Sequence, residues 1–110
     1  SYGPDDGTLS CSGVLASLPF APEIVLPAVR DMFARYPEML TGQQFASGFN
    51  PTLAGADSRA WVSRGHFGLD QGIVMLMIEN YRTELIWRLM RNCPFVATGL
   101  RRAGFRGGWL

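Results

Sequence analysis

The spacing of apolar residues predicts an amphipathic helix in the first half of the chain. Apolar side chains recur every three or four residues over 24–33, as they do on one face of a helix. Pro22 suits the first turn, where no N–H partner is needed. Pro37 ends the run, because the residue before proline disfavours the α conformation. The helix is therefore expected over about 21–36, and Pro27 predicts a kink within it.

A longer helix is predicted from Asp70 to about Asn92. Asp70 is a favourable N-cap residue, and a Cys-Pro pair stops the run after Asn92. The part over 73–78 is apolar on every side, whereas the following part has a polar stripe. Glu84 and Arg88 lie four residues apart in that stripe, a spacing that favours an ion pair. A helix that is apolar all round must be enclosed by other elements.

The segment between the two helices has a different composition. Residues 38–65 are rich in Gly, Ser, Thr, Asn and Pro, with strand-like pieces at 44–49 and 60–63. Turns are expected at 50–52 and 55–57. This pattern predicts a small β-hairpin or an irregular excursion, and long connections of this kind are often functional.

Composition limits the class of protein. The chain has 110 residues, 47% hydrophobic and 17% charged, with a formal net charge of +1, which excludes a disordered tail. Its two cysteines are too few for a disulfide scaffold, and they either pair or remain free. No apolar run reaches about 18 residues, so no membrane span is expected. One domain fits the length, but its few elements cannot enclose the second helix. The chain is therefore expected to belong to a larger helical body, with its first twelve residues in a loop.

The sequence offers no metal or cofactor motif. His66 is the single histidine, and neither a zinc motif nor a phosphate-binding glycine loop is present, so no metal and no cofactor are expected. Residues 80–110 hold six arginines and one acid, Glu84. Arg101, Arg102 and Arg106 allow an anion-binding interpretation. We favour a solvated segment that pairs with the acidic N-terminal part, and we expect no nucleic-acid partner.

The carboxylates offer a more specific chemistry. Glycoside cleavage needs two of them, one to protonate the leaving oxygen and one to activate water or attack the sugar. Asp5, Asp6 and Asp70 are candidates, and the aromatic residues Phe45, Phe49, Trp61 and Phe67 precede Asp70. Each carboxylate also has a structural interpretation: Asp70 as an N-cap and the Asp pair as turn residues. Glu79 has one too, as a buried partner of Arg82.

Three segments together resemble a known family. They are the stretch Tyr-Gly-Pro-Asp-Asp-Gly-Thr over 2–8, Gly-His-Phe-Gly-Leu-Asp-Gln-Gly over 65–72, and Met-Ile-Glu-Asn-Tyr-Arg over 77–82. The chain resembles the C-terminal portion of the bacterial glycoamylase-like (putative glucoamylase) family. That family is related to the β-1,2-glucanases of glycoside hydrolase family 144 and to cyclic β-1,2-glucan synthases. The chain departs from the expected pattern at Ile73, where the family has Pro, and by an insertion over 51–60.

The resemblance implies an all-α fold, the C-terminal part of an (α/α)6 toroid with a small β-hairpin or irregular excursion. Residues 1–110 would be the C-terminal portion of one catalytic domain, and the remainder of that domain would be a partner. Since the pocket of such toroids lies at the N-terminal ends of the inner helices, the resemblance makes Asp70 the catalytic residue. It assigns substrate binding to five others: Asp5, Asp6, Trp61, Phe67 and Gln71.

The resulting hypothesis is a glycoside hydrolase that cleaves a glucan, β-1,2-linked by resemblance, through carboxylate acid/base chemistry. Its substrate would be an oligo- or polysaccharide. The general acid would lie in the preceding part of the domain, so the chain alone is expected to be inactive. The alternative is a non-catalytic carbohydrate-binding or scaffold segment. The resemblance also favours an extracytoplasmic location, periplasmic or secreted.

Overall fold

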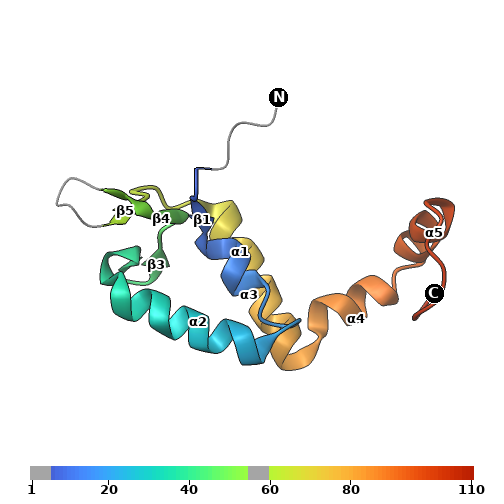
Figure 1. Ribbon diagram of the computed structural model, residues 1–110. Helices are drawn as coiled ribbons and strands as arrows, with labels where there is room; N and C mark the ends of the chain where they lie inside the picture. Colours follow the sequence, from blue (N-terminus) through green and yellow to red (C-terminus); the bar gives the residue numbers. More distant parts are fainter. Residues whose placement is uncertain (1–5, 55–59) are drawn as a thin grey trace.

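Helices make up most of the regular structure in residues 6–54 and 60–110, the parts of the chain that the computed structural model describes. The helices are α1 (Cys11–Ala16), α2 (Pro22–Arg35), α3 (Gly68–Thr83), α4 (Leu85–Arg91) and α5 (Pro94–Arg102), with a 3-10 turn η1 (Pro37–Met39) after α2. Helices α1 and α3 lie side by side with α2 below them, and α4 and α5 extend from α3 toward the far end of a curved body (Figure 1). The prediction of a predominantly helical fold is confirmed.

The segment between α2 and α3 forms β structure, as predicted, but it is more than one hairpin. Two antiparallel sheets are present in the described residues. The strands are β1 (Leu9–Ser10), β4 (Gly48–Ala54) and β5 (Ala60–Val62) in one sheet, in the order β1-β4-β5, and β2 (Leu40–Thr41) and β3 (Gln44–Phe45) in the other. The prediction of a loop over the first twelve residues is wrong at β1, which pairs with β4. Short strands far apart in sequence carry no local signal of such a pairing.

Asn50 lies inside β4, where the sequence predicted a turn. It pairs with Trp61 of β5, and the register shifts between Asn50 and Ala54. Its side-chain Oδ1 accepts hydrogen bonds from the backbone N–H of Thr52 (2.9 Å) and of Leu53 (3.0 Å). The Asn50-Pro51 pair therefore produces a shift of register within β4, and the strand does not end there. The turn predicted at 55–57 lies outside the described residues.

Replacing Asn50 by alanine is expected to lower the free energy of unfolding of the full-length protein by about 2–4 kcal/mol. The side chain is 1% exposed and also donates to the backbone carbonyl of Asp6 at 2.7 Å. Its loss removes the partner of three backbone groups, those of Asp6, Thr52 and Leu53, in bonds that are partly shielded from water, which costs more than an exposed bond would. Urea denaturation measures the change. The exposed Asn92 is the matched control, and a similar loss for Asn92→Ala would contradict this account.

The first predicted helix is confirmed as α2. Pro22 is its first residue, and the helix continues unbroken through Pro27 to Arg35. Tyr36 leaves the helical conformation, with φ −126° and ψ 67°, because it precedes Pro37. Local sequence alone accounts for both ends.

The sequence pattern did not predict helix α1. Ser10 is its N-cap, and Ser10 Oγ accepts a hydrogen bond from the backbone N–H of Gly13 at 3.1 Å. With six residues, α1 is too short to show a helical period. Contacts with α2 and α3 stabilise it instead, as is usual for short helices.

Asp70 is not the N-cap of α3, so that prediction is wrong. The helix begins two residues earlier, after Phe67, which adopts an extended conformation with φ −110° and ψ 130°. Asp70 is the third helical residue, where a carboxylate still interacts favourably with the positive helix end. The side chain is engaged by Ser12 of α1, a tertiary contact that the local sequence cannot reveal.

The predicted continuous helix over 70–92 is broken at Glu84. Glu84 adopts a left-handed conformation, with φ 55° and ψ 20°, and separates α3 from α4. Neighbouring side chains supply partners at the break. Asn80 Oδ1 accepts from the backbone N–H of Trp87 at 3.1 Å, and Thr83 Oγ1 accepts from that of Leu85 at 3.2 Å.

The break also changes the predicted polar stripe. Asn80 is 2% exposed and not on a solvated face. Glu84 forms an ion pair with Arg91, at 3.5 Å, and the predicted pair with Arg88 is not formed. The predicted pair of Glu79 with Arg82 is present at 3.9 Å, although it lies at the surface, with Arg82 70% exposed.

The core is small and lies at one end of the molecule. Its buried cluster joins α1, α2, η1, β3, β4 and the first half of α3, and it consists of Cys11, Met32, Met39, Phe45, Ala46, Phe49 and Val74. Helices α4 and α5 contribute no fully buried residue. The radius of gyration is 17.3 Å, whereas a compact chain of this length has about 13 Å. The C-terminal helices therefore extend away from the core.

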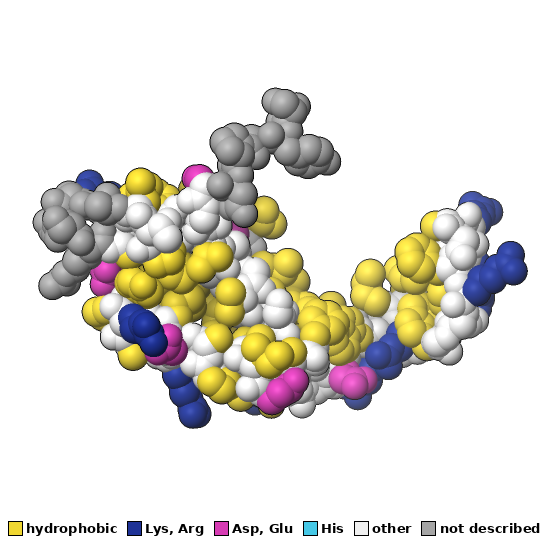
Figure 2. Space-filling view, viewed as in Figure 1, with side chains coloured by type: hydrophobic (Ala, Val, Ile, Leu, Met, Phe, Trp, Pro, Cys, Tyr) yellow, Lys and Arg dark blue, Asp and Glu magenta, His cyan; other side chains and the backbone are white. Residues whose placement is uncertain are grey.

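Apolar side chains on α3, α4 and α5 are exposed to an unusual degree. On α3, Leu69 is 84% and Met75 71% exposed, and Phe95 of α5 is 85% exposed. Figure 2 shows hydrophobic side chains gathered where α3 meets α4 and on α5. Soluble proteins rarely leave large contiguous apolar patches open to water. The expectation that the second helix needs further elements around it agrees with this exposure.

Candidate functional site

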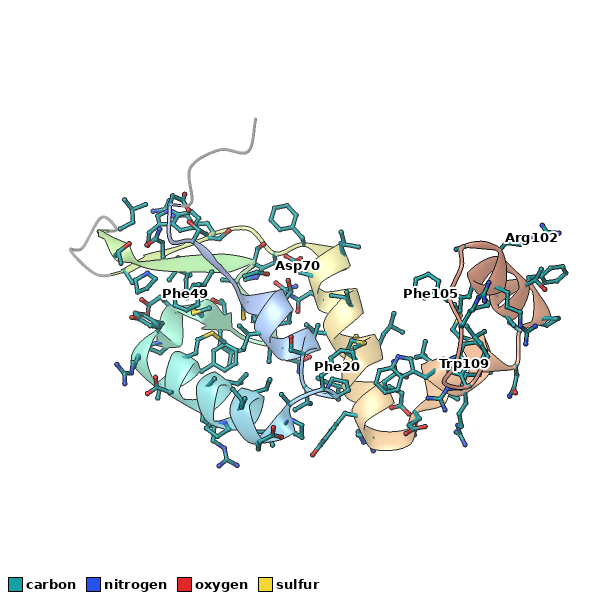
Figure 3. All side chains as sticks on the ribbon, turned by 45° about the vertical axis from the view of Figure 1, so that its right-hand side comes forward. Phe20, Phe49, Asp70, Arg102, Phe105 and Trp109 are labelled. Carbon is teal, nitrogen blue, oxygen red and sulfur yellow. The ribbon has the colours of Figure 1, made fainter. Side chains whose placement is uncertain are left out.

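Asp70 lies in the first turn of α3, where that helix packs against α1 and lies near the three-stranded sheet (Figures 1 and 3). The side chain is half-buried. Ser12 of α1, which is 7% exposed, donates its hydroxyl hydrogen to Asp70 Oδ1 at 3.2 Å. The carboxylate is thus held from a second helix, fifty-eight residues away in sequence. A carboxylate in this position interacts favourably with the positive end of the helix, and the catalytic role of Asp70 stays a prediction.

Cys11 adjoins this site but does not have the properties of a nucleophile. Its side chain is fully buried, and burial, together with the negative charge of Asp70, raises the pKa of the thiol to about 11. At neutral pH the thiol is therefore protonated, and a thiol reacts only as its thiolate. Both Cys11 and Cys93 are free, which settles the alternative left open by the sequence.

Gln71 is the neighbour of Asp70 and anchors α3 to β3. Its Nε2 donates to the backbone carbonyl of Phe45 at 3.0 Å, and His66 Nδ1 lies 3.0 Å from the same oxygen. These contacts fix the entry into α3. The predicted contact of Gln71 with substrate stays a prediction.

Asp6 lies at the surface in the chain segment that leads to β1. Its Oδ1 accepts from the backbone N–H of Thr8 at 2.9 Å, and this bond holds the pKa of the carboxyl below its usual range. Its backbone carbonyl is bound by Asn50, which also pairs with Trp61 of β5. Asn50 therefore brings the predicted residues Asp6 and Trp61 to one region of the sheet. The predicted residue Asp5 lies outside the described residues.

The four aromatic residues that precede Asp70 divide into two pairs. Phe45 and Phe49 are 9% and 6% exposed and belong to the core, with Phe49 5.2 Å from Tyr36 between ring centroids. Trp61 is 38% exposed and Phe67 56%. Of these four residues, Trp61 and Phe67 are the exposed pair, and their contact with substrate stays a prediction.

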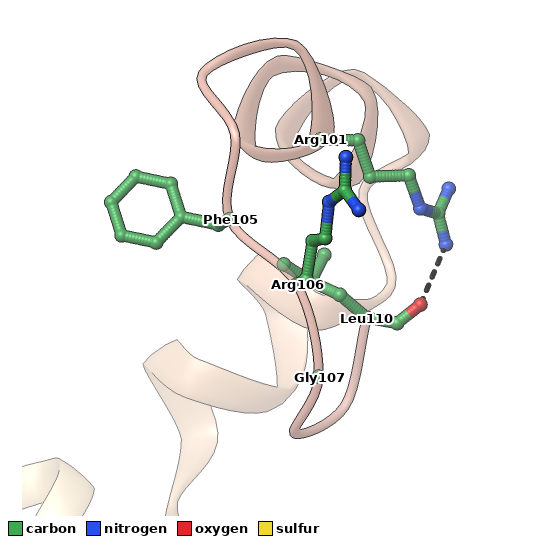
Figure 4. A pocket seen from close by; sticks show the side chains of 5 residues that line it. All are labelled: Arg101, Phe105, Arg106, Gly107 and Leu110. Carbon is green, nitrogen blue, oxygen red and sulfur yellow. Dashed lines mark hydrogen bonds between the residues drawn. The ribbon is translucent and has the colours of Figure 1, made fainter.

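The arginine-rich end forms a separate surface. A hollow of about 310 Å³ lies between α5 and the chain end (Figure 4). It is lined by Arg101, Phe105, Arg106, Gly107 and Leu110, and Arg101 donates to the backbone carbonyl of Leu110 at 3.1 Å. None of the ion pairs in residues 6–54 and 60–110 involves Arg101, Arg102 or Arg106. The predicted pairing of this segment with the acidic N-terminal part is therefore wrong for the described part of the chain.

The described ranges lack both a metal-binding cluster and a membrane-spanning helix. No group of three or more His, Cys, Asp or Glu residues there could hold a metal ion. No helix there is long and apolar enough to cross a membrane.

Ser12 and Asn50 are the residues of this region that sequence reasoning missed. Ser12 lies in a stretch predicted to be loop, and Asn50 in a predicted turn. Ser10 followed by Gly13, at N-cap spacing, is a signal that could have indicated α1 and hence placed Ser12 in its first turn.

Sequence and structure comparisons place the chain in a family. Residues 1–94 match the Glycoamylase family model, described as "Putative glucoamylase". The chain belongs to this family, as its motifs indicated. A curated relative, an exo β-1,2-glucooligosaccharide sophorohydrolase (non-reducing end) from Parabacteroides distasonis, is 37% identical over 99 residues, which are 89% of this chain and 13% of the relative.

Solved structures with similar folds agree with this family membership. A putative glucoamylase from Bacteroides uniformis superimposes with a TM-score of 0.76 at 38% identity, over 96% of this chain and 24% of that one. An endo-β-1,2-glucanase from Chitinophaga pinensis, in complex with sophorotriose and glucose, has a TM-score of 0.74 at 29% identity with the same coverage. The chain thus spans about a quarter of these structures and a smaller share of the curated relative.

Proposed function

We propose that this chain is part of a glycoside hydrolase that cleaves a β-1,2-linked glucan by carboxylate acid/base chemistry. The observation that carries the proposal is the likeness, over nearly the whole chain, to proteins named for hydrolysis of β-1,2-glucans or their oligosaccharides. Asp70 provides a half-buried carboxylate at a helix N-terminus, which is the kind of group this chemistry needs.

In the proposed architecture, residues 1–110 form the C-terminal portion of an (α/α)6 toroid and α3 is one of its inner helices. The exposed apolar faces of α3, α4 and α5 support this, because neighbouring helix pairs would cover them. The share of the related structures that the chain spans supports it too. Since the pocket of such a toroid lies at the N-terminal ends of the inner helices, Asp70 would face it.

In the proposed mechanism, Asp70 acts as the base that activates water, or holds the sugar at the cleavage point. A second carboxyl group, in the rest of the toroid, protonates the leaving oxygen. Trp61 and Phe67 offer exposed rings against which the apolar face of a sugar can stack. Asp5, Asp6 and Gln71 would supply hydrogen bonds to sugar hydroxyl groups.

A substrate panel tests the proposed function. The full-length protein is incubated with linear β-1,2-glucan, a β-1,3-glucan and starch, and the release of reducing ends is measured. We expect release from the β-1,2-glucan to be at least about 100-fold faster than from the other two, because the hydrogen-bonding groups of a pocket discriminate between linkages. Cleavage of starch alone would overturn the proposed linkage. Binding of β-1,2-glucan without release of sugar would favour a carbohydrate-binding segment instead.

A further inference from the structure

A chain of hydrogen bonds leads from the start of α1 to Asp70. The backbone N–H of Gly13 donates to Ser10 Oγ at 3.1 Å, Ser10 Oγ lies 3.1 Å from Ser12 Oγ, and Ser12 Oγ donates to Asp70 Oδ1 at 3.2 Å. Ser10 and Ser12 flank Cys11 in sequence, and their hydroxyl groups meet at the helix start because Ser10 is the N-cap residue and has an extended conformation. The candidate catalytic carboxylate is the end point of this chain.

The direction of the hydrogen bonds follows from the number of hydrogens. Each serine hydroxyl has one hydrogen to donate and can accept two others. The hydrogen of Ser12 is used on the Asp70 carboxylate, which can only accept, so Ser12 must accept from Ser10. Ser10 in turn accepts from Gly13. All donors therefore point toward the carboxylate.

The first members of this hydrogen-bond chain are attached to the sheet by backbone contacts. Ser10 belongs to β1 and pairs with Gly48 of β4. Between the two serines, the backbone N–H of Cys11 donates to the carbonyl of Ser47 at 3.1 Å, and its side chain is fully buried. Ser12 is 7% exposed. A hydroxyl fixed in this way defines the position of the oxygen that it binds.

We infer that Ser12 is a positioning residue for Asp70, with Ser10 orienting the hydroxyl of Ser12. The inference rests on the proposed function of Asp70. The hydrogen bond from Ser12 to Asp70 Oδ1 fixes the orientation of the Asp70 carboxylate, so that Asp70 Oδ2 is presented to water or to the sugar. The start of α1, pinned to the sheet, thus sets the geometry of a reacting group on α3.

Variants of the full-length protein test this inference by kinetics on β-1,2-glucooligosaccharides. Ser12→Ala is expected to lower kcat by about 10- to 100-fold and to change KM by less than about 3-fold, because a misplaced group slows the reaction more than it weakens binding. Ser12→Thr retains the hydroxyl and is expected to recover most of kcat. Ser17→Ala is the matched control, because Ser17 is a serine at the end of α1 whose hydroxyl donates to the Gly13 carbonyl at 2.8 Å.

Crystal structures of the wild type, Ser12→Ala and Ser12→Thr supply a readout that does not depend on the substrate. We expect Asp70 to have one side-chain conformation in the wild type and in Ser12→Thr, and to be rotated or disordered in Ser12→Ala. An unchanged Asp70 conformation in Ser12→Ala would overturn the inference. A Ser12→Thr variant with a kcat as low as that of Ser12→Ala would also overturn it, because the hydroxyl group would then not be what matters. A wild type that leaves β-1,2-glucan intact would refute the proposed function, while the Asp70 conformations would still decide the positioning role.

Discussion

Asp70→Asn in the full-length protein is expected to lower kcat for β-1,2-glucan hydrolysis by about 100- to 10,000-fold, the usual contribution of a general acid or base. Asparagine has nearly the same shape and retains an oxygen that accepts from Ser12, so the contact between α1 and α3 should survive. It can neither take up a proton nor carry a negative charge. The chemistry is therefore removed while the packing remains.

Asp31→Asn is the matched control for this substitution. Asp31 lies on α2 and forms an exposed ion pair with Arg35 at 2.8 Å, so its loss should cost less than about 1 kcal/mol of stability and leave kcat unchanged. Rates come from reducing-end assays, and circular dichroism checks the fold. If Asp70→Asn kept half or more of the wild-type kcat, Asp70 would have no part in the mechanism. If it unfolded the protein, Asp70 would have a structural role.

Where residues close together in sequence determine the structure, the sequence pattern predicted it correctly. Helix α2 begins at Pro22 and ends before Pro37, because proline restricts the backbone whatever surrounds it. The strand pieces around 44–49 and 60–63 were predicted for a similar reason, from short apolar runs between turn-forming residues. These features depend on neighbours in sequence.

Where contacts between residues far apart in sequence determine the structure, the sequence pattern did not predict it. Asp70 has a strong N-cap preference, yet α3 begins after Phe67 and the carboxylate binds Ser12, fifty-eight residues away. The break at Glu84 depends on the buried side chain of Asn80, which binds the backbone of the next helix. Helical periodicity continues across the break, so it gives no sign of it.

The candidate site was predicted from motifs that resemble those of a family, and not from the spacing or the chemistry of its residues. Asp70 was identified because its surroundings resemble a family, whereas its local sequence alone favours a capping role. Ser12 escaped notice because its relation to Asp70 exists only after α1 and α3 pack together. A single sequence shows which residues are chemically capable, and the fold shows which of them meet.

The second large effect is expected at Met75, on an apolar face that the described chain leaves open. Met75 is 71% exposed, whereas its neighbour Val74 is 4% exposed and lies in the core. If α3 is an inner helix of a toroid, the remaining helices of the domain bury Met75 as well. Met75→Asp would then place an unpaired carboxylate in an apolar interface. We expect it to lower the free energy of unfolding of the full-length protein by about 3–5 kcal/mol.

Urea denaturation of the full-length protein measures this loss, with Arg30→Asp as the control. Arg30 is an exposed residue of α2, so introducing the same aspartate there should change stability by less than about 0.5 kcal/mol. Because Arg30→Asp lowers the net charge by two and Met75→Asp by only one, a larger loss for Met75→Asp reports burial of the α3 face and not a general effect of negative charge. A loss below about 1 kcal/mol for Met75→Asp would mean that this face stays in water. The inner-helix assignment would then fail, and with it the argument that places Asp70 at the pocket of a toroid.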